Sequence, residues 1–202
     1  MRVLVACEFS GRVRDAFIRL GHDAISCDLL PTEAPGPHHE GDIDEILWDS
    51  DWDLIIAHPP CTYLCNSGVQ HLHKEEGRWD KLDEGAAFFK RFLDHPCKKI
   101  CVENPIPHKY AVERIGSKYT QIIQPWQFGH PEQKATCLWL KGLKPLEGTR
   151  DVKDIMRKRP KSEQQAIFYA SPGIDRGKKR SVTFWGVAWA MAKQWGEEHG
   201  KN

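Results

Sequence analysis

The sequence predicts an α/β fold with a mostly parallel, doubly wound sheet. Short apolar runs typical of buried strands alternate along the chain with amphipathic stretches typical of helices. Four groups of unusual residues directly follow predicted strands, and parallel strands present their carboxyl ends at the one edge of a sheet where ligands bind. The sequence therefore predicts one functional site at that edge. The four groups are Phe9-Ser10-Gly11, Asp28, Pro59-Pro60-Cys61 and Glu103-Asn104-Pro105.

The N-terminal part predicts a strand, a helix and a second strand, which together form half of a Rossmann-like nucleotide-binding unit. Residues 3–6 form a buried run that Gly11 breaks, and residues 24–27 form the next run before Asp28. Between the two runs, apolar side chains recur at helical spacing until Gly21 stops the helix. These side chains are Val13, Ala16, Phe17 and Leu20.

The rest of the chain continues the alternation and predicts a single domain over residues 1–202. Pro59 ends one predicted strand, because proline cannot extend the hydrogen-bond ladder. Glu103 is predicted to follow the next strand directly. The predicted elements are a strand over 53–58, a helix over 79–93, strands over 99–102, 120–124 and 136–140, and a helical apolar stripe over 182–195.

The composition excludes several classes of protein. The longest apolar runs are far shorter than the about 20 residues of a membrane-spanning helix. Eight Trp, eight Phe and four Tyr exclude a wholly disordered chain. Seven cysteines cannot all pair, and the N-terminus does not match an export signal, so we expect a reducing, cytoplasmic compartment. Five thiols are predicted to be small buried side chains: Cys7, Cys27, Cys97, Cys101 and Cys137.

We predict no metal centre. Cys97 and Cys101 have a spacing that zinc sites use, but they run into a predicted strand that separates them by about 13 Å. Cys61 and Cys65 share this spacing, with His71 and His73 nearby. The second tight cysteine pair that a structural zinc site needs is missing from this arrangement.

The net charge of +1 hides an uneven distribution. Residues 141–180 contain twelve Lys or Arg and five Asp or Glu, which gives +7 and leaves −6 for the other residues. This basic segment predicts contact with a polyanion, although charge alone equally suits a solvated loop. The candidate phosphate contacts are Arg157, Lys158, Arg159, Lys178, Lys179 and Arg180.

The first half of the predicted site suits a cofactor that contains ribose. Gly11 provides a turn after the first strand, and Asp28 ends the second strand, where a carboxylate accepts ribose hydroxyls. Pyrophosphate-binding turns need three glycines, and this turn has one. S-adenosylmethionine has a ribose and no pyrophosphate, and Asp42 is placed to accept its adenine amine. As alternatives, Asp28 is a turn residue and Asp42 caps a helix.

The second half of the site suits chemistry on a pyrimidine. Two prolines project Cys61 from the end of one strand, and Glu103 leaves the neighbouring strand in the same direction. Carbon 5 of a pyrimidine becomes nucleophilic when a thiolate attacks carbon 6, and an acid at the ring nitrogen stabilises the charge that develops. Cys61 is therefore the candidate nucleophile, and Glu103 is the candidate acid.

These motifs resemble the cytosine-5 DNA methyltransferase family, in a short form similar to those of phages and prophages. The resemblance implies the class I S-adenosylmethionine-dependent methyltransferase fold, S-adenosylmethionine as cofactor and DNA as partner. It assigns catalytic roles to Cys61, Glu103 and Lys134. It assigns cofactor-binding roles to Phe9, Ser10, Gly11, Asp28, Asp42, Ile43 and Pro59, and Arg180-Ser181-Val182 resembles the motif that closes the pocket.

The chain departs from the family pattern at several positions. His58 stands where the family has Gly, Thr62 where it has Gln, and Lys134 alone keeps a basic charge in the family's Gln-x-Arg-x-Arg motif. Residues 141–180 are a basic insertion, too short for a full target-recognition domain. We therefore expect little sequence preference, easier access to single-stranded DNA, and a monomer or weak dimer.

Other functions remain open on the sequence. The same chemistry can act on RNA or on a free pyrimidine nucleotide. Methylation of an exocyclic amine uses a Pro-Pro-aromatic motif, and Cys61 stands at the aromatic position here. The third alternative is a catalytically silent protein that binds nucleic acid.

Overall fold

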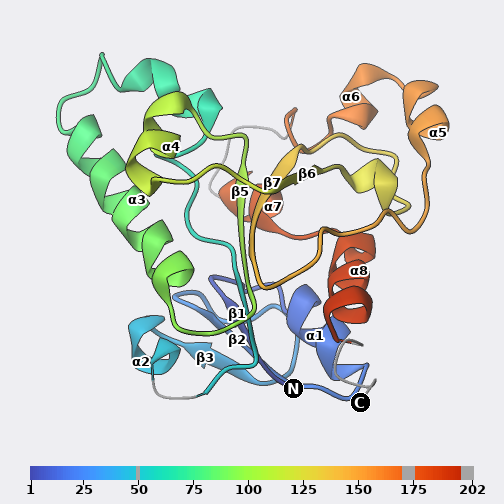
Figure 1. Cartoon of the computed structure of the whole chain (residues 1–202). Helices are drawn as coiled ribbons and strands as arrows, with labels where there is room; N and C mark the ends of the chain where they lie inside the picture. The colour runs from blue at the N-terminus through green and yellow to red at the C-terminus, as the bar shows by residue number, and fades with distance from the viewer. Residues whose placement is uncertain (49–50, 170–175, 197–202) are drawn as a thin grey trace.

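The computed structural model describes residues 1–48, 51–169 and 176–196. In this part of the chain, seven strands form a single sheet (Figure 1). The strands are β1 (Arg2–Ala6), β2 (Asp23–Asp28), β3 (His38–Glu40), β4 (Leu54–Ala57), β5 (Ile100–Pro105), β6 (Gln121–Ile123) and β7 (Thr136–Lys141).

The strand order is β3-β2-β1-β4-β5-β7-β6. Neighbouring strands from β3 to β5 are parallel, whereas β7 is antiparallel to both β5 and β6. The chain moves outward from β1 in one direction through β2 and β3, and in the other through β4 and β5. This is the predicted Rossmann-like, mostly parallel α/β fold, and its switch point lies between β1 and β4.

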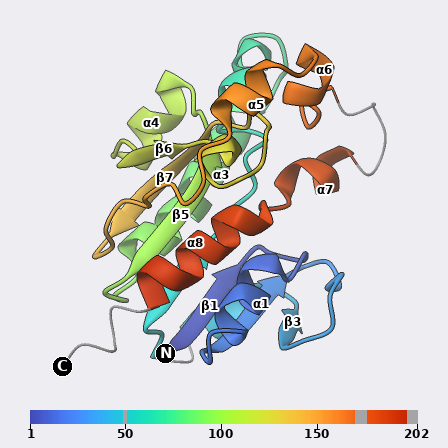
Figure 2. The ribbon, with the colours of Figure 1, turned by 90° about the vertical axis from the view of Figure 1, so that its right-hand side faces the viewer.

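Helices cover both faces of the sheet, with α1 and α8 on one face and α3 and α4 on the other (Figure 2). The helices are α1 (Arg12–Ile18), α2 (Asp44–Leu47), α3 (Arg78–Asp94), α4 (Lys109–Ile115), α5 (Lys153–Arg157), α6 (Lys161–Gln164), α7 (Arg176–Ser181) and α8 (Trp185–Gly196). Two short 3-10 helices are η1 (Asn66–His71) and η2 (Pro125–Gln127). No helix among the described residues is long and apolar enough to cross a bilayer.

The alternation of side chains along the strands explains the two apolar cores. Leu4 and Ala6 of β1 belong to the core beneath α3, whereas Val3 and Val5 belong to the core beneath α1 and α8. Successive side chains of a strand point to opposite faces, so a strand covered on both faces is apolar throughout. The predicted stripe of the last helix is confirmed for Val187, Ala188, Met191 and Trp195, which are buried. The helix begins only at Trp185, so Phe184, the other predicted member, lies before it.

Two predicted boundaries are wrong. α1 ends at Ile18, and Leu20 is 37% exposed, because a tight turn before Gly21 replaces the last helical turn. β5 continues through Glu103 to Pro105, because β7 pairs with it beyond the end of β4. The pairing of Ala57 with Val102 ends the β4 ladder, so Glu103 lies just past its end.

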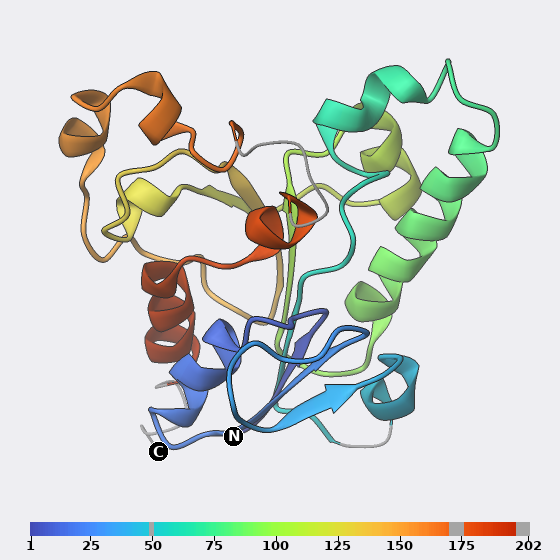
Figure 3. The ribbon, with the colours of Figure 1, turned by 180° about the vertical axis from the view of Figure 1, so that it is seen from behind.

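Backbone hydrogen bonds hold the basic segment after β7 against η2. Three backbone hydrogen bonds join the residues 150–152 to the residues 126–129, and Leu146 packs in the core beneath α8. The Nζ atom of Lys153 lies 4.8 Å from the centre of the Trp126 ring. α5 and α6 therefore sit beside η2, whereas α7 lies over the carboxyl ends of the central strands (Figure 3).

Candidate active site

A cavity of about 670 Å³ opens at the carboxyl ends of the central strands, beneath α7. It lies at the switch point, where this fold places ligands. Side chains from both predicted halves of the site line it, together with two of the predicted basic residues. These residues are Phe9, Asp28, Pro59, Cys61, Glu103, Lys134, Lys178 and Arg180.

Cys61 reaches this cavity from the turn that follows β4. Pro59 is buried and Pro60 is exposed, so the chain leaves the sheet at this point. The backbone amides of Leu64 and Cys65 donate to the carbonyl oxygen of Cys61, at 3.0 and 2.9 Å. This turn places the partly exposed Cys61 thiol on the cavity wall, as the two prolines predicted.

Cys61 and Cys65 form a pair of interacting thiols. A hydrogen bond from Cys61 lowers the pKa of Cys65 to about 5 against the opposing effect of burial, with help from the Ser67 hydroxyl and the Gly68 amide. The same hydrogen bond, followed by burial and the charge of Cys65, raises the pKa of Cys61. The charge of Arg180 favours the thiolate at both positions. The pair can therefore hold one negative charge and one proton near neutral pH.

Glu103 faces His58 across the end of β4. The Nδ1 atom of His58 lies 3.1 Å from Oε2 of Glu103, and both side chains are largely buried. Burial raises the pKa of the Glu103 carboxyl, but the hydrogen bond from His58 and the charge of Lys134 outweigh burial and hold this pKa below its usual value. Glu103 is thus an ionised group that its surroundings stabilise.

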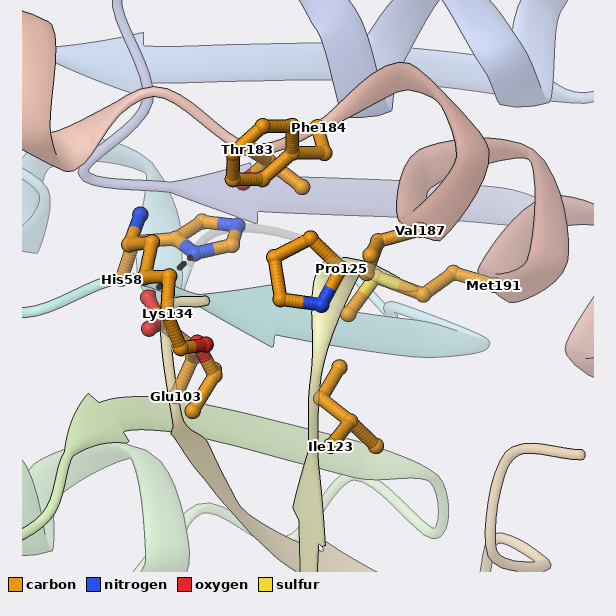
Figure 4. A pocket seen from close by; sticks show the side chains of 10 residues that line it. His58, Glu103, Ile123, Pro125, Lys134, Thr183, Phe184, Val187 and Met191 are labelled. Atoms are coloured by element: carbon orange, nitrogen blue, oxygen red, sulfur yellow. Dashed lines mark hydrogen bonds and ion pairs between the residues drawn. The ribbon is translucent and has the colours of Figure 1, made fainter. Parts of the chain in front are cut away.

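Lys134 joins the same cluster from the segment before β7. Its Nζ atom donates to the carbonyl oxygen of Val182 at 3.3 Å, which links it to the segment between α7 and α8. Burial lowers the pKa of Lys134, while the charges of Glu103 and Cys61 act in the opposite direction. Figure 4 shows the Lys134 side chain running beside His58 and Glu103. The three predicted catalytic residues therefore come together around one cavity.

On the other side of the cavity, Phe9 and Asp28 follow β1 and end β2. The Phe9 ring is buried, and Nζ of Lys178 lies 5.6 Å from its centre. Asp28 accepts the amide of Leu30 through Oδ1 at 3.0 Å, so this carboxylate also shapes a turn. Asp28 raises the pKa of the nearby Cys7 and Cys27 thiols, after the larger effect of burial.

Four predicted cofactor residues do not line this cavity. Ser10 donates to Oε1 of Glu8 at 3.0 Å, and Gly11 begins α1 with a positive φ of 71° that favours glycine. Ile43 is buried in the core beneath α3. Asp42 is exposed and accepts the amide of Asp44 at 3.0 Å, in the turn before α2, whose N-cap is Ile43 and not Asp42. Their roles toward a cofactor stay predictions.

The residues at the N-terminus of α1 limit which cofactor can bind on the Phe9 and Asp28 side of the cavity. The buried Glu8 carboxylate accepts the amides of Val13 at 2.8 Å and Arg14 at 3.4 Å. The N-terminus of a helix is where nucleotide-binding folds hold phosphate, and here a carboxylate already fills it. A neighbouring pair of acids, Asp28 and Asp42, contributes to the raised pKa of Cys7. The carboxylates of Glu8 and Asp28 therefore suit an uncharged ribose and do not suit pyrophosphate.

The predicted basic residues separate into two groups. Lys178 and Arg180 line the cavity, whereas Arg157, Lys158 and Arg159 are exposed on and after α5, beside η2. Arg157 pairs with Asp154 of the same helix at 3.6 Å. The Lys179 side chain lies outside the part that the structure describes.

Four further cavity residues bear on the chemistry of the site, although the sequence predicted no catalytic or binding role for them. His58 and Cys65 are partners of the predicted catalytic residues, and Phe168 is an exposed aromatic residue on the cavity rim. Cys7 was predicted to be buried, but it is partly exposed, lines the cavity and has a positive φ of 57°. That strained conformation follows from its position directly after β1, at the turn toward Phe9. In the sequence, the signal that could have indicated His58 and Cys65 is that both lie close to Pro59-Pro60-Cys61.

No protein-family model matches this sequence, and a search of curated proteins also finds no match. Among solved structures, a candidate DNA modification methyltransferase encoded within a prophage of E. coli is 13% identical, with a TM-score of 0.47 over 86% of this chain and 56% of its own. The Entamoeba histolytica methyltransferase EhMeth is 14% identical, with a TM-score of 0.46 over 75% and 57%. The S. pombe Dnmt2 methyltransferase is 16% identical, with a TM-score of 0.44 over 87% and 61%. This chain thus spans less than two thirds of the length of each of the three.

Proposed function

We propose that this protein transfers a methyl group from S-adenosylmethionine to carbon 5 of cytosine in DNA. One observation carries the proposal. Cys61, Glu103 and Lys134 meet at the ends of neighbouring strands, around the same cavity as Phe9 and Asp28. A nucleophile, an acid and a candidate cofactor site within one cavity are what methylation of a pyrimidine carbon requires.

Each catalytic side chain has a separate task in this reaction. The Cys61 thiolate bonds to carbon 6 of the pyrimidine, and Cys65 is the group that can take the Cys61 proton. Its surroundings favour the carboxylate, so Glu103 first takes up a proton from solvent and then gives it to the ring nitrogen at position 3, which leaves carbon 5 electron-rich. Lys134 keeps a positive charge beside the resulting Glu103 carboxylate. After methyl transfer, a water molecule takes the proton from carbon 5, and the bond between Cys61 and carbon 6 breaks. Cys61 leaves as the thiolate and recovers its proton from Cys65, while the proton on the ring nitrogen returns to Glu103.

The cofactor half supports an adenosyl group. Asp28 would accept the ribose hydroxyls, Asp42 the adenine amine, and Phe9 and Pro59 would provide apolar surface, while Ser10, Gly11 and Ile43 would support them from the turn and the core. S-adenosylmethionine, when bound, supplies an electrophilic methyl group. Lys178 over the Phe9 ring would cover this half from α7.

The charges around the cavity support DNA as the partner. Lys178 and Arg180 would contact phosphates next to the target base, and Arg157, Lys158 and Arg159 would contact the backbone farther away. Phe168, 59% exposed on the rim, offers a surface for stacking a neighbouring base. We also propose that residues 141–180 are a basic insertion in a single methyltransferase domain, and that they favour single strands with little sequence preference.

The test is transfer of labelled methyl from S-adenosylmethionine to four acceptors: duplex DNA, single-stranded DNA, RNA and deoxycytidine monophosphate. We expect label at carbon 5 of cytosine, with single-stranded DNA as the best acceptor. Cys61→Ala should abolish transfer, with a loss of about 10³-fold or more. Cys97→Ser, which changes a buried thiol far from the cavity, is the matched control and should retain activity.

The other outcomes identify the alternatives. Transfer that prefers RNA or the free nucleotide keeps the chemistry and overturns the choice of DNA. Label on the exocyclic amine, unchanged in Cys61→Ala, overturns the covalent mechanism. Binding of nucleic acid without any binding of S-adenosylmethionine identifies a catalytically silent protein.

A further inference from the structure

His58 is a largely buried histidine whose Nδ1 atom bonds to Glu103. Its side chain is 6% exposed, and that of Glu103 is 14% exposed. The residue directly follows β4, one step beyond the pairing of Ala57 with Val102. That register brings the imidazole opposite the Glu103 carboxyl across the strand end. The family resemblance has Gly at this position, so the contact is a property of this chain.

The second nitrogen of His58 is buried beside a small cavity. Nε2 is buried, and no residue that the structure describes bonds to it. A cavity of about 20 Å³ adjoins the ring, bounded by Pro125, Thr183 and Phe184 (Figure 4). Such a space holds a single water molecule, since about 10–15 Å³ is enough. A water there would donate to Nε2 and leave the other nitrogen as the one that carries hydrogen.

The contact therefore fixes the direction of the hydrogen bond. A carboxylate only accepts, so Nδ1 of His58 carries the hydrogen and donates it to Oε2 of Glu103. When Glu103 is in its acid form, its own proton must then lie on Oε1. The other ionisable groups around this carboxyl have no described bond to it. They are Lys134, Cys61, Cys101 and Cys137, with Arg12 and Arg180 acting on Lys134.

We propose that His58 is a positioning residue that holds Oε2 of Glu103 and so presents the proton on Oε1 to the pyrimidine ring. The inference rests on the proposed cytosine chemistry. The Oε1 proton passes to the ring nitrogen as the bond between Cys61 and carbon 6 forms. It returns to Oε1 when that bond breaks, so the residue ends as it began. Throughout, the hydrogen of Nδ1 stays on His58.

The hydrogen bond between His58 and Glu103 also predicts how the pH dependence of the rate changes when His58 is replaced. The bond from His58 lowers the pKa of Glu103, so its removal raises that pKa. The rate depends on the acid form of Glu103 and falls as pH rises through its pKa. His58→Ala should therefore move the falling limb of the pH profile to higher pH. It should also lower the maximal rate by about 10²-fold, because Oε1 is no longer oriented.

His58→Asn separates positioning from titration. The Asn amide can donate to Oε2 in place of Nδ1, and it cannot ionise. We expect His58→Asn to keep most of the activity and the native falling limb. His95→Asn, a change at another buried histidine far from the cavity, is the matched control for burial.

Two results would overturn the inference. The first is a falling limb at the same pH in His58→Ala and the native protein, and the second is an equal loss of activity in His58→Asn and His58→Ala. Carbon-13 NMR of the Glu103 carboxyl, without any acceptor, gives a readout that needs no activity. The carboxyl should titrate at higher pH in His58→Ala. If the native protein transfers no methyl group, the proposed function fails, while this titration still decides whether His58 controls Glu103.

Discussion

The two sides of the cavity are held together in different ways. Around Cys61, polar side chains act on one another: His58 donates to Glu103, Cys65 bonds to Ser67, and Cys61 and Cys65 shift each other's pKa. Around Asp28, many polar side-chain bonds fix the backbone of a turn or loop. Asp28 accepts an amide of its own turn, and the buried Arg14 donates to carbonyl oxygens of the loop after β2.

Because of this difference, a substitution should have a different effect on each side of the cavity. On the Cys61 side, a substitution changes the reactivity of a neighbouring side chain while the backbone is left in place. On the Asp28 side, a substitution changes the shape of a loop or the affinity for what the loop binds. Substitutions on the Cys61 side should therefore lower the rate of the reaction, and substitutions on the Asp28 side should lower stability or binding.

Among substitutions that test this comparison, the largest effect is expected at Glu103. Glu103→Gln keeps the size of the side chain and removes the acidic proton, so methyl transfer should fall by about 10²- to 10³-fold. Binding of S-adenosylmethionine, measured by calorimetry, should not change. Glu113→Gln, on the exposed face of α4, is the matched control. An equal loss of cofactor binding in Glu103→Gln would erase the distinction between the two sides.

Arg14 gives the next largest effect, on stability. Its side chain is fully buried, and it donates to the Ala34 carbonyl at 2.9 Å and to the Ser26 hydroxyl at 3.1 Å. Arg14→Met leaves these acceptors without a donor, so the free energy of unfolding in urea should fall by about 3 kcal/mol. Arg19→Met removes an exposed arginine after α1 and should cost less than about 1 kcal/mol. Equal losses in the two variants would contradict this role of Arg14.

Asp28 should affect binding alone. Asp28→Asn can still shape the turn at Leu30, but it loses the charge that ribose hydroxyls and S-adenosylmethionine favour. The dissociation constant for the cofactor should rise by about tenfold, with the maximal rate unchanged. Asp23→Asn, at the exposed start of β2, should have no effect. A fall in the maximal rate at saturating cofactor would place Asp28 with the catalytic residues.

The smallest effect is a shift in the pH dependence of thiol labelling. The pKa of Cys65 is about 5, so the pair should react with iodoacetamide from neutral pH down to about pH 5. In Cys65→Ala, burial and the charge of Glu103 raise the pKa of the remaining Cys61, so labelling should move to higher pH. At pH 6 the variant should react several-fold more slowly, because a thiol with a raised pKa has a smaller thiolate fraction at that pH. Mass spectrometry of the labelled peptides measures the rate. An unchanged pH profile would mean that the thiols are independent.

Much of the fold was predictable because it rests on periodic patterns. β1, β4 and β5 are apolar runs that need cover on both faces, and α3 and α8 carry apolar stripes at helical spacing. β3 and α4 were not predicted. β3 is three residues long and polar, and His108 begins α4 through a side-chain hydrogen bond that ordinary capping residues usually provide.

The site was predictable where a residue lies at the end of a strand or a few residues beyond it. Phe9, Asp28, Cys61 and Glu103 were found in this way, and all of them line the cavity. The partners were not predictable, because they depend on register and turn geometry. His58 meets Glu103 only because Ala57 pairs with Val102, and Cys65 meets Cys61 through a turn whose bonds the sequence does not reveal.

A covalent trap tests the central claim most directly. Single-stranded DNA with 5-fluorocytosine at its only cytosine would be incubated with the native protein and S-adenosylmethionine. Fluorine at carbon 5 cannot leave as a proton does, so the bond between Cys61 and carbon 6 should persist. We predict a denaturant-resistant complex whose peptide is modified at Cys61, formed also by Cys65→Ala and absent in Cys61→Ala. A native protein that binds cofactor and DNA but forms no adduct, or forms it at another residue, would contradict the account.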